Sequence, residues 1–117
     1  MRAFVSFLET TATQRSEEHG GLGPIAFRRL LEADDFESKI DFVDTTVIPP
    51  QSTIGRHQHV GSEEIYYIVR GTPRVCVERE ERRLQQGDIA VVRSGQSHEL
   101  INDTDADVHI FVVQVRV

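Results

Sequence analysis

The residues best suited to chemistry stand in one short stretch, HQHVGSEEIYYIVRG, at positions 57–71. His57 and His59 alternate, and residues two apart on a β-strand point to the same face. Glu64 follows after a turn at positions 60–62, so an antiparallel return strand would bring its carboxylate beside the two imidazoles. Two nitrogens and one oxygen form a donor set suited to a divalent transition metal. The stretch therefore predicts part of a metal site.

A second stretch offers a third imidazole. Positions 87–102 read GDIAVVRSGQSHELIN, with a glycine before one predicted strand and a second glycine at the following turn. His98 opens the next strand. If that strand lies beside the one that carries His57 and His59, His98 completes a set of three imidazoles and one carboxylate.

Strands are the elements that must position these residues. Helical periodicity is hard to find, whereas short runs rich in Val, Ile, Phe, Tyr and Thr recur between Gly and Pro signals. The predicted strands are IAFRRLL, IDFVDTTVI, EEIYYIVR, PRVCVERE, DIAVVR, HELIN and VHIFVVQVRV. Many short strands at close spacing predict an all-β sandwich or barrel.

The N-terminal part follows a different pattern. Residues 3–8 are predicted as a first strand and residues 10–23 as a polar, Gly-rich loop, while residues 31–39 could form a helical turn. We expect residues 1–23 to take part in a dimer interface and residues 24–117 to form the barrel. An unpaired first strand would leave a sheet edge exposed, which pairing with a second subunit would cover.

Size and charge limit the classes of partner. A chain of 117 residues forms one domain. Thirteen Lys and Arg against nineteen Asp and Glu give a net charge of −6, which repels polyanions, so nucleic acid is not an expected partner. The single cysteine, the lack of a signal-peptide pattern and the lack of a membrane-length apolar run predict a cytoplasmic protein that does not bind membranes.

Together the two histidine stretches resemble the two motifs of small single-domain cupins. The first motif, G-x5-H-x-H-x(3,4)-E-x6-G, matches at His57, His59, Glu64 and Gly71. The second, G-x5-P-x-G-x2-H-x3-N, matches at Gly87, Gly95, His98 and Asn102. The sequence departs from the motifs at Gln51, where the first glycine would stand, and at Arg93, where the proline would stand. Neither departure removes a metal donor.

The resemblance implies a fold, a cofactor and a range of activities. The fold would be a double-stranded β-helix, the jelly-roll cupin barrel. One divalent transition metal per chain, Fe(II), Mn, Zn or Ni, would be held by His57, His59, Glu64 and His98, with two of six positions open. The implied function is a metal-dependent enzyme of dioxygenase, isomerase or cyclase type acting on a small oxygen-rich or anionic molecule. The alternative is a non-catalytic module that binds or senses a small, oxalate-like acid. Related barrels commonly form homodimers.

The remaining polar candidates carry weaker expectations. Tyr66 shares the face of Glu64 and could orient a substrate or only pack in the core, and Arg93 could be a cation at the rim of the pocket or only a surface charge. His19 in its polar loop, His109 in the last strand and Cys76 are expected to have no part in the site.

Overall fold

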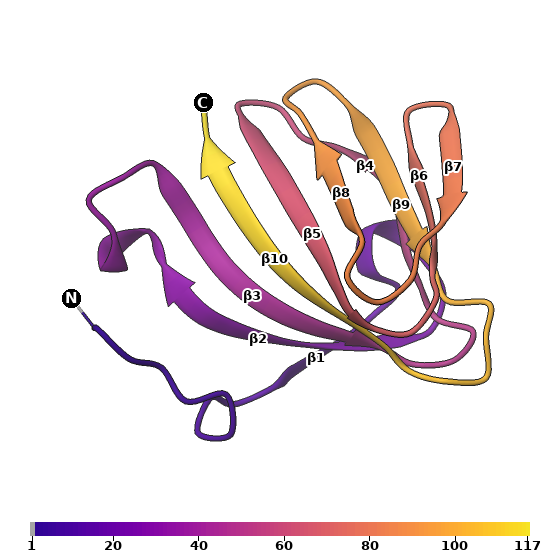
Figure 1. Ribbon diagram of the computed structural model, residues 1–117, viewed down its shortest axis with the longest axis horizontal. Coiled ribbons are helices and arrows are strands. Elements are labelled where there is room, and N and C mark those ends of the chain that lie inside the picture. Colours follow the sequence, from indigo (N-terminus) through magenta and orange to yellow (C-terminus); the bar gives the residue numbers. More distant parts are fainter. Residues whose placement is uncertain (1) are drawn as a thin grey trace.

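A computed structural model, which describes residues 2–117, shows ten strands in two antiparallel sheets (Figure 1). The larger sheet has the order β1 (Thr13–Ser16), β2 (Pro24–Glu32), β3 (Ile40–Ile48), β10 (Val108–Arg116), β5 (Ser62–Arg70) and β8 (Ile89–Val92). The smaller sheet has the order β4 (Thr53–Gln58), β9 (Ser97–Ile101), β6 (Arg74–Val77) and β7 (Glu80–Arg83). The predicted all-β jelly-roll architecture is confirmed.

The core lies between the two sheets and follows the period-two pattern of the strands. On β5, Glu64, Tyr66 and Ile68 are buried, whereas Ile65 and Tyr67 on the opposite face are about two-fifths exposed. The core cluster also draws apolar side chains from both sheets: Ile25, Ile48, Ile54, Val75, Leu100, Val108, Ile110 and Val112. A polar residue on the inward face of β5 therefore enters the space between the sheets.

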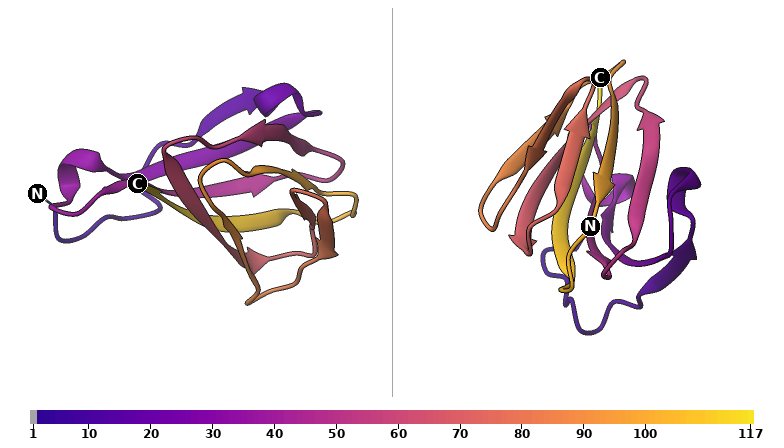
Figure 2. Two further views of the ribbon diagram at one scale, coloured as in Figure 1. Left: turned by 90° about the horizontal axis from the view of Figure 1, so that it is seen from above. Right: turned by 90° about the vertical axis from the view of Figure 1, so that its right-hand side faces the viewer.

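The prediction of a strand at residues 3–8 is wrong. The segment before β1 runs outside both sheets (Figures 1 and 2) and is held by side chains instead of strand pairing. The guanidinium of Arg28 lies over Phe7, 4.1 Å from the centroid of the phenyl ring, and the ring centroids of Phe7 and His109 are 5.9 Å apart. The first strand is β1, within the predicted loop, where it pairs with β2.

Two other local predictions need adjustment. The stretch PRVCVERE holds β6 and ends at the first residue of β7, because the chain turns at Glu78, whose φ is 56°. Of the predicted helical turn at residues 31–39, only the 3-10 turn η2 (Ala33–Asp35) forms, closed by reciprocal bonds between Glu32 and Asp35. No helix in residues 2–117 is long and apolar enough to cross a membrane.

The departure at Gln51 has a visible backbone consequence. Its φ is 66°, the left-handed conformation that glycine adopts at little cost. The tight turn after β3 is kept, with the Gln51 backbone N–H donating to the carbonyl of Asn102 at 2.8 Å. The turn therefore retains the geometry that a glycine would give, at the cost of a strained backbone at Gln51.

Candidate metal centre

Two neighbouring strands of the smaller sheet bring the three imidazoles together. His57 on β4 is the register partner of His98 on β9, and His59 follows the last residue of β4. One ring nitrogen from each of the three lies within 4.8 Å of the others. The Nε2 atoms of His59 and His98 are 2.7 Å apart. The three nitrogens therefore converge on one small volume.

The carboxylate comes from the opposite sheet. Glu64 on β5 points inward and is only 5% exposed. Its Oε1 atom lies 3.7 Å from Nε2 of His59 and 4.0 Å from Nε2 of His98. The structure thus brings the four predicted residues to one place, from both sheets and from two distant parts of the sequence.

Hydrogen bonds around the imidazoles fix how two rings are turned. Nδ1 of His57 lies 2.8 Å from the carbonyl of Gly55, so it carries the hydrogen and donates, which leaves Nε2 with a free lone pair. The hydroxyl of Tyr66 lies against one edge of the His98 ring, 2.9 Å from Nδ1 and 3.2 Å from Nε2. Partners of this kind orient histidine ligands in metal proteins.

Burial sets the protonation of the cluster. It lowers the pKa of His98 to about 3, and the neighbouring imidazoles of His57 and His59 add to that effect. Burial also lowers the pKa of His57 and of His59. By contrast, burial raises the pKa of Glu64 to about 7. At neutral pH the imidazoles are therefore neutral, which is the form that binds a metal.

The donor set fits a divalent transition metal. Three neutral imidazoles and a carboxylate match the ligands that zinc, iron and manganese accept. Two nitrogens bonded at right angles to one ion, each at about 2.1 Å, would lie about 3 Å apart, close to the separation of the His59 and His98 nitrogens. The residues present therefore suit the metal that the two motifs imply.

A fourth imidazole, from His19, lies against the cluster, contrary to expectation. Its ring stacks on His57 with centroids 3.6 Å apart and planes 10° apart. His19 belongs to the 3-10 turn η1 (Glu18–Gly20) and has a φ of 51°. The turn packs so closely on β4 that a Cβ at Gly55 would lie 2.2 Å from the carbonyl oxygen of His19. The only sequence signal was the glycine at position 55, which permits this approach.

A cavity of about 260 Å³ opens beside the histidines. Its lining includes three of the clustered residues, His57, His59 and Glu64, together with Tyr66. Farther along, Arg29 lines the wall and pairs with Asp44 through contacts of 2.7 and 3.0 Å. Arg29 is thus a cation at the site that the sequence did not reveal.

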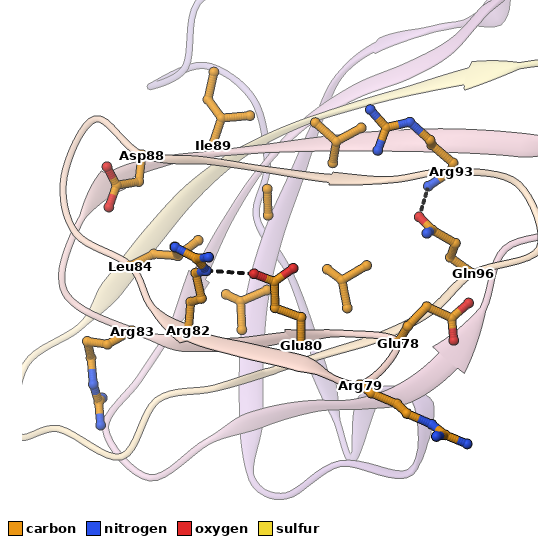
Figure 3. A pocket seen from close by; sticks show the side chains of 14 residues that line it. Glu78, Arg79, Glu80, Arg82, Arg83, Leu84, Asp88, Ile89, Arg93 and Gln96 are labelled. Carbon is orange, nitrogen blue, oxygen red and sulfur yellow. Dashed lines mark hydrogen bonds and ion pairs between the residues drawn. The ribbon is translucent and has the colours of Figure 1, made fainter.

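Arg93 does not line this cavity, so of its two interpretations the cation at the rim of the metal pocket has no support here. It is exposed just after β8, the edge strand of the larger sheet, and it follows the inward-facing Val92. Arg93 lines a second, larger cavity of about 770 Å³, where the Glu80–Arg82 ion pair also lies (Figure 3).

Comparison with known proteins shows which family this chain belongs to. The family model of the cupin domain matches residues 45–114, and this range includes all four clustered residues. The chain belongs to the cupin family. An oxalate-binding protein of Thermotoga maritima is 30% identical to this cupin over 105 residues, covering 90% of this chain and 87% of the relative.

Solved structures agree on the fold. A predicted oxalate decarboxylase from Thermotoga maritima superposes with a TM-score of 0.94 at 28% identity, covering 97% of this cupin and 99% of that chain. The polyketide cyclase RemF from Streptomyces resistomycificus has a TM-score of 0.75 at 17% identity, covering 99% of this chain and 80% of its own. The second likeness shows the fold alone.

Proposed function

We propose that this cupin holds one divalent transition metal ion per chain, Fe(II), Mn, Zn or Ni, and uses it to bind a small organic acid. The proposed ligands are His57, His59, Glu64 and His98. The observation that supports the proposal most is the convergence of three imidazole nitrogens within 4.8 Å at the wall of a cavity. A resident divalent ion would supply a Lewis acid for an incoming carboxylate.

Two relatives support an acid as the ligand. One is named an oxalate-binding protein and the other a predicted oxalate decarboxylase, and both align with nearly the whole chain. The local charge agrees, because a divalent ion with three neutral imidazoles and one carboxylate carries a net positive charge. That charge attracts an anion although the whole protein carries a net charge of −6.

Turnover of the bound acid is the finer part of the proposal. Tyr66 keeps its proton at neutral pH, because burial raises its pKa well above the ordinary value of a tyrosine. Its hydroxyl contacts His98 and its side chain lines the cavity. We assign Tyr66 to orienting the acid and donating a hydrogen bond to it, in an enzyme of dioxygenase, isomerase or cyclase type.

The test separates binding from turnover. Protein loaded in turn with Fe(II), Mn(II) and Zn(II) is titrated with oxalate by calorimetry and then incubated with small carboxylates, diketones and thiols, while product and oxygen uptake are followed. Binding that requires the metal supports the acid site. Oxalate binding that is equally strong in protein stripped of metal contradicts it.

A non-catalytic binding module is the second candidate, favoured by the name of the relative that is 30% identical. It predicts tight metal-dependent binding of an acid with no turnover under any of the three metals. Turnover under any of the three metals that is lost in Tyr66→Phe would favour the enzyme. A cytoplasmic location stays a prediction.

A homodimer is also proposed, on a surface different from the one expected. Outward-facing apolar residues form two continuous rows across β10, β5 and β8. The rows follow the strand register as Val113–Ile65–Val91 and Phe111–Tyr67–Ile89. The solvated face of an antiparallel sheet normally carries polar residues, so an apolar outer face indicates an interface. A two-fold dimer would bury the same face on both copies.

A further inference from the structure

The cavity beside the imidazoles is larger than oxalate requires. A water molecule occupies about 30 Å³ of liquid, so 260 Å³ holds roughly nine waters. Oxalate consists only of two joined carboxylates and would leave most of that space unfilled. The ligand that fits the whole cavity therefore has a body beyond the group that meets the cluster.

Away from the imidazoles, one part of the cavity wall is apolar, and the charged and polar lining residues stand beside it. The apolar part is built from inward-facing side chains of both sheets: Ile25, Phe27, Phe42, Ile54, Ile110 and Val112. Phe27 and Ile110 flank Thr46 in register across β2, β3 and β10, so they form one row of the wall. An apolar body gains affinity on such a wall by leaving water.

Guanidiniums that belong to ion pairs lie beside both phenyl rings of this wall. The guanidinium of Arg15, paired with Glu18, lies 4.5 Å from the ring centroid of Phe27. The guanidinium of Arg29 lies 4.0 Å from the ring centroid of Phe42 and 5.8 Å from that of Phe27. The same guanidinium is bound on one side by both carboxylate oxygens of Asp44. The charges of the pair cancel, so this part of the wall offers aromatic surface without demanding a second anion.

The charge of the lining fits one anionic group. The cavity is lined by three carboxylates, from Glu18, Asp44 and Glu64, and by two guanidiniums, from Arg15 and Arg29. With neutral imidazoles these groups sum to −1, and a divalent ion changes the sum to +1. A singly charged acid balances the site, whereas a dianion such as oxalate leaves an uncompensated negative charge.

From size, lining and charge together we infer that this cupin takes a singly charged acid with an aromatic or branched apolar body, one of the 2-oxo or 2-hydroxy acid class. The carboxylate and its adjacent oxygen lie at the imidazole cluster, and the body lies against Phe27 and Phe42. This inference rests on the proposed function, because the same metal site receives the acid.

The experiment compares pyruvate and phenylpyruvate, which have the same chelating 2-oxo acid group, and includes oxalate as a third acid. Protein loaded with Mn(II) is titrated by calorimetry with oxalate, pyruvate and phenylpyruvate. We expect phenylpyruvate to bind at least tenfold more tightly than pyruvate. Phe27→Ala removes part of the wall and Thr46→Phe fills the cavity, and each should reduce that advantage to below threefold while pyruvate affinity changes little.

A control variant separates loss of the cavity wall from a general effect of removing a phenyl ring. Phe4→Ala truncates an exposed phenyl ring before β1, outside the cavity lining, and should leave the advantage intact. If Thr46→Phe does not fold, Phe27→Ala, which only removes atoms, carries the test. Equal affinities for pyruvate and phenylpyruvate would overturn the inference and leave the proposed function standing, as would an advantage that survives Phe27→Ala. Failure of all three acids to bind would instead overturn the proposed function.

Discussion

Metal affinity should depend on pH through Glu64. The carboxylate is buried, which raises its pKa from an ordinary value to about 7, so near pH 6 it carries a proton that an incoming metal must displace. The imidazoles have lowered pKa values, so they lose their protons at lower pH than Glu64 does. The sign follows: affinity is weak where the carboxyl group is protonated, rises with pH, and levels off above the pKa of Glu64.

The size of the effect can be worked from that pKa. Glu64 is about nine-tenths protonated at pH 6 and about one-tenth protonated at pH 8, so affinity should rise about tenfold between the two, or about 1.4 kcal/mol. About one proton should be released per metal at pH 6 and almost none at pH 8. Calorimetric titration with Mn(II) in two buffers of different ionisation enthalpy measures both quantities.

Glu64→Gln is the control, because it keeps the shape of the side chain and has no proton to lose. Its affinity should be lower at every pH and should change little between pH 6 and pH 8. The reasoning is refuted if wild-type affinity is flat over this range, or if Glu64→Gln shows the same tenfold rise.

Three further changes test separate parts of the structure. His19→Ala should weaken metal affinity about twofold to tenfold in the same titration, since ring stacking contributes about 0.5–1.5 kcal/mol, and His19→Phe should restore it; equal loss in both variants would contradict a stacking role. Tyr67→Glu on the outer face of β5 should give a monomer by light scattering. Val60→Glu, which replaces an exposed apolar residue in a loop, should stay dimeric. A monomeric wild type would rule out the interface. Gln51→Gly should raise the free energy of unfolding in urea by up to about 1 kcal/mol, because the backbone there is left-handed, and a loss of stability would show that the side chain matters more than the strain.

Those parts of the fold that depend on alternation were predictable from the sequence. His57 and His59 share a face because a strand has a period of two, and Arg56 and Gln58 are exposed on the other face as expected. The glycine turn between His59 and Glu64 reverses the chain, so the carboxylate returns beside the imidazoles. The resemblance to two motifs indicated His98, whose pairing with His57 is a contact between distant segments that alternation alone does not predict.

What the sequence did not reveal depends on contacts between distant segments. His19 approaches His57 because a strained turn packs on the glycine of β4, and neither the strain nor the approach has a periodic signal. Residues 3–8 have strand-forming side chains, yet Phe7 is drawn to Arg28 and His109 instead of to a neighbouring strand. Local propensity is overridden where one tertiary contact is stronger than an available strand edge.

Metal content is the most direct test of the central claim. Wild-type protein purified without chelators is analysed by elemental mass spectrometry, beside His98→Ala and His109→Ala, with circular dichroism to check that each variant is folded. We predict about one divalent transition-metal ion per chain in the wild type and in His109→Ala, and less than about a tenth of that in His98→Ala. A folded His98→Ala protein that retains full metal content, or a wild type that binds no divalent metal even when supplied with it, would contradict the assignment.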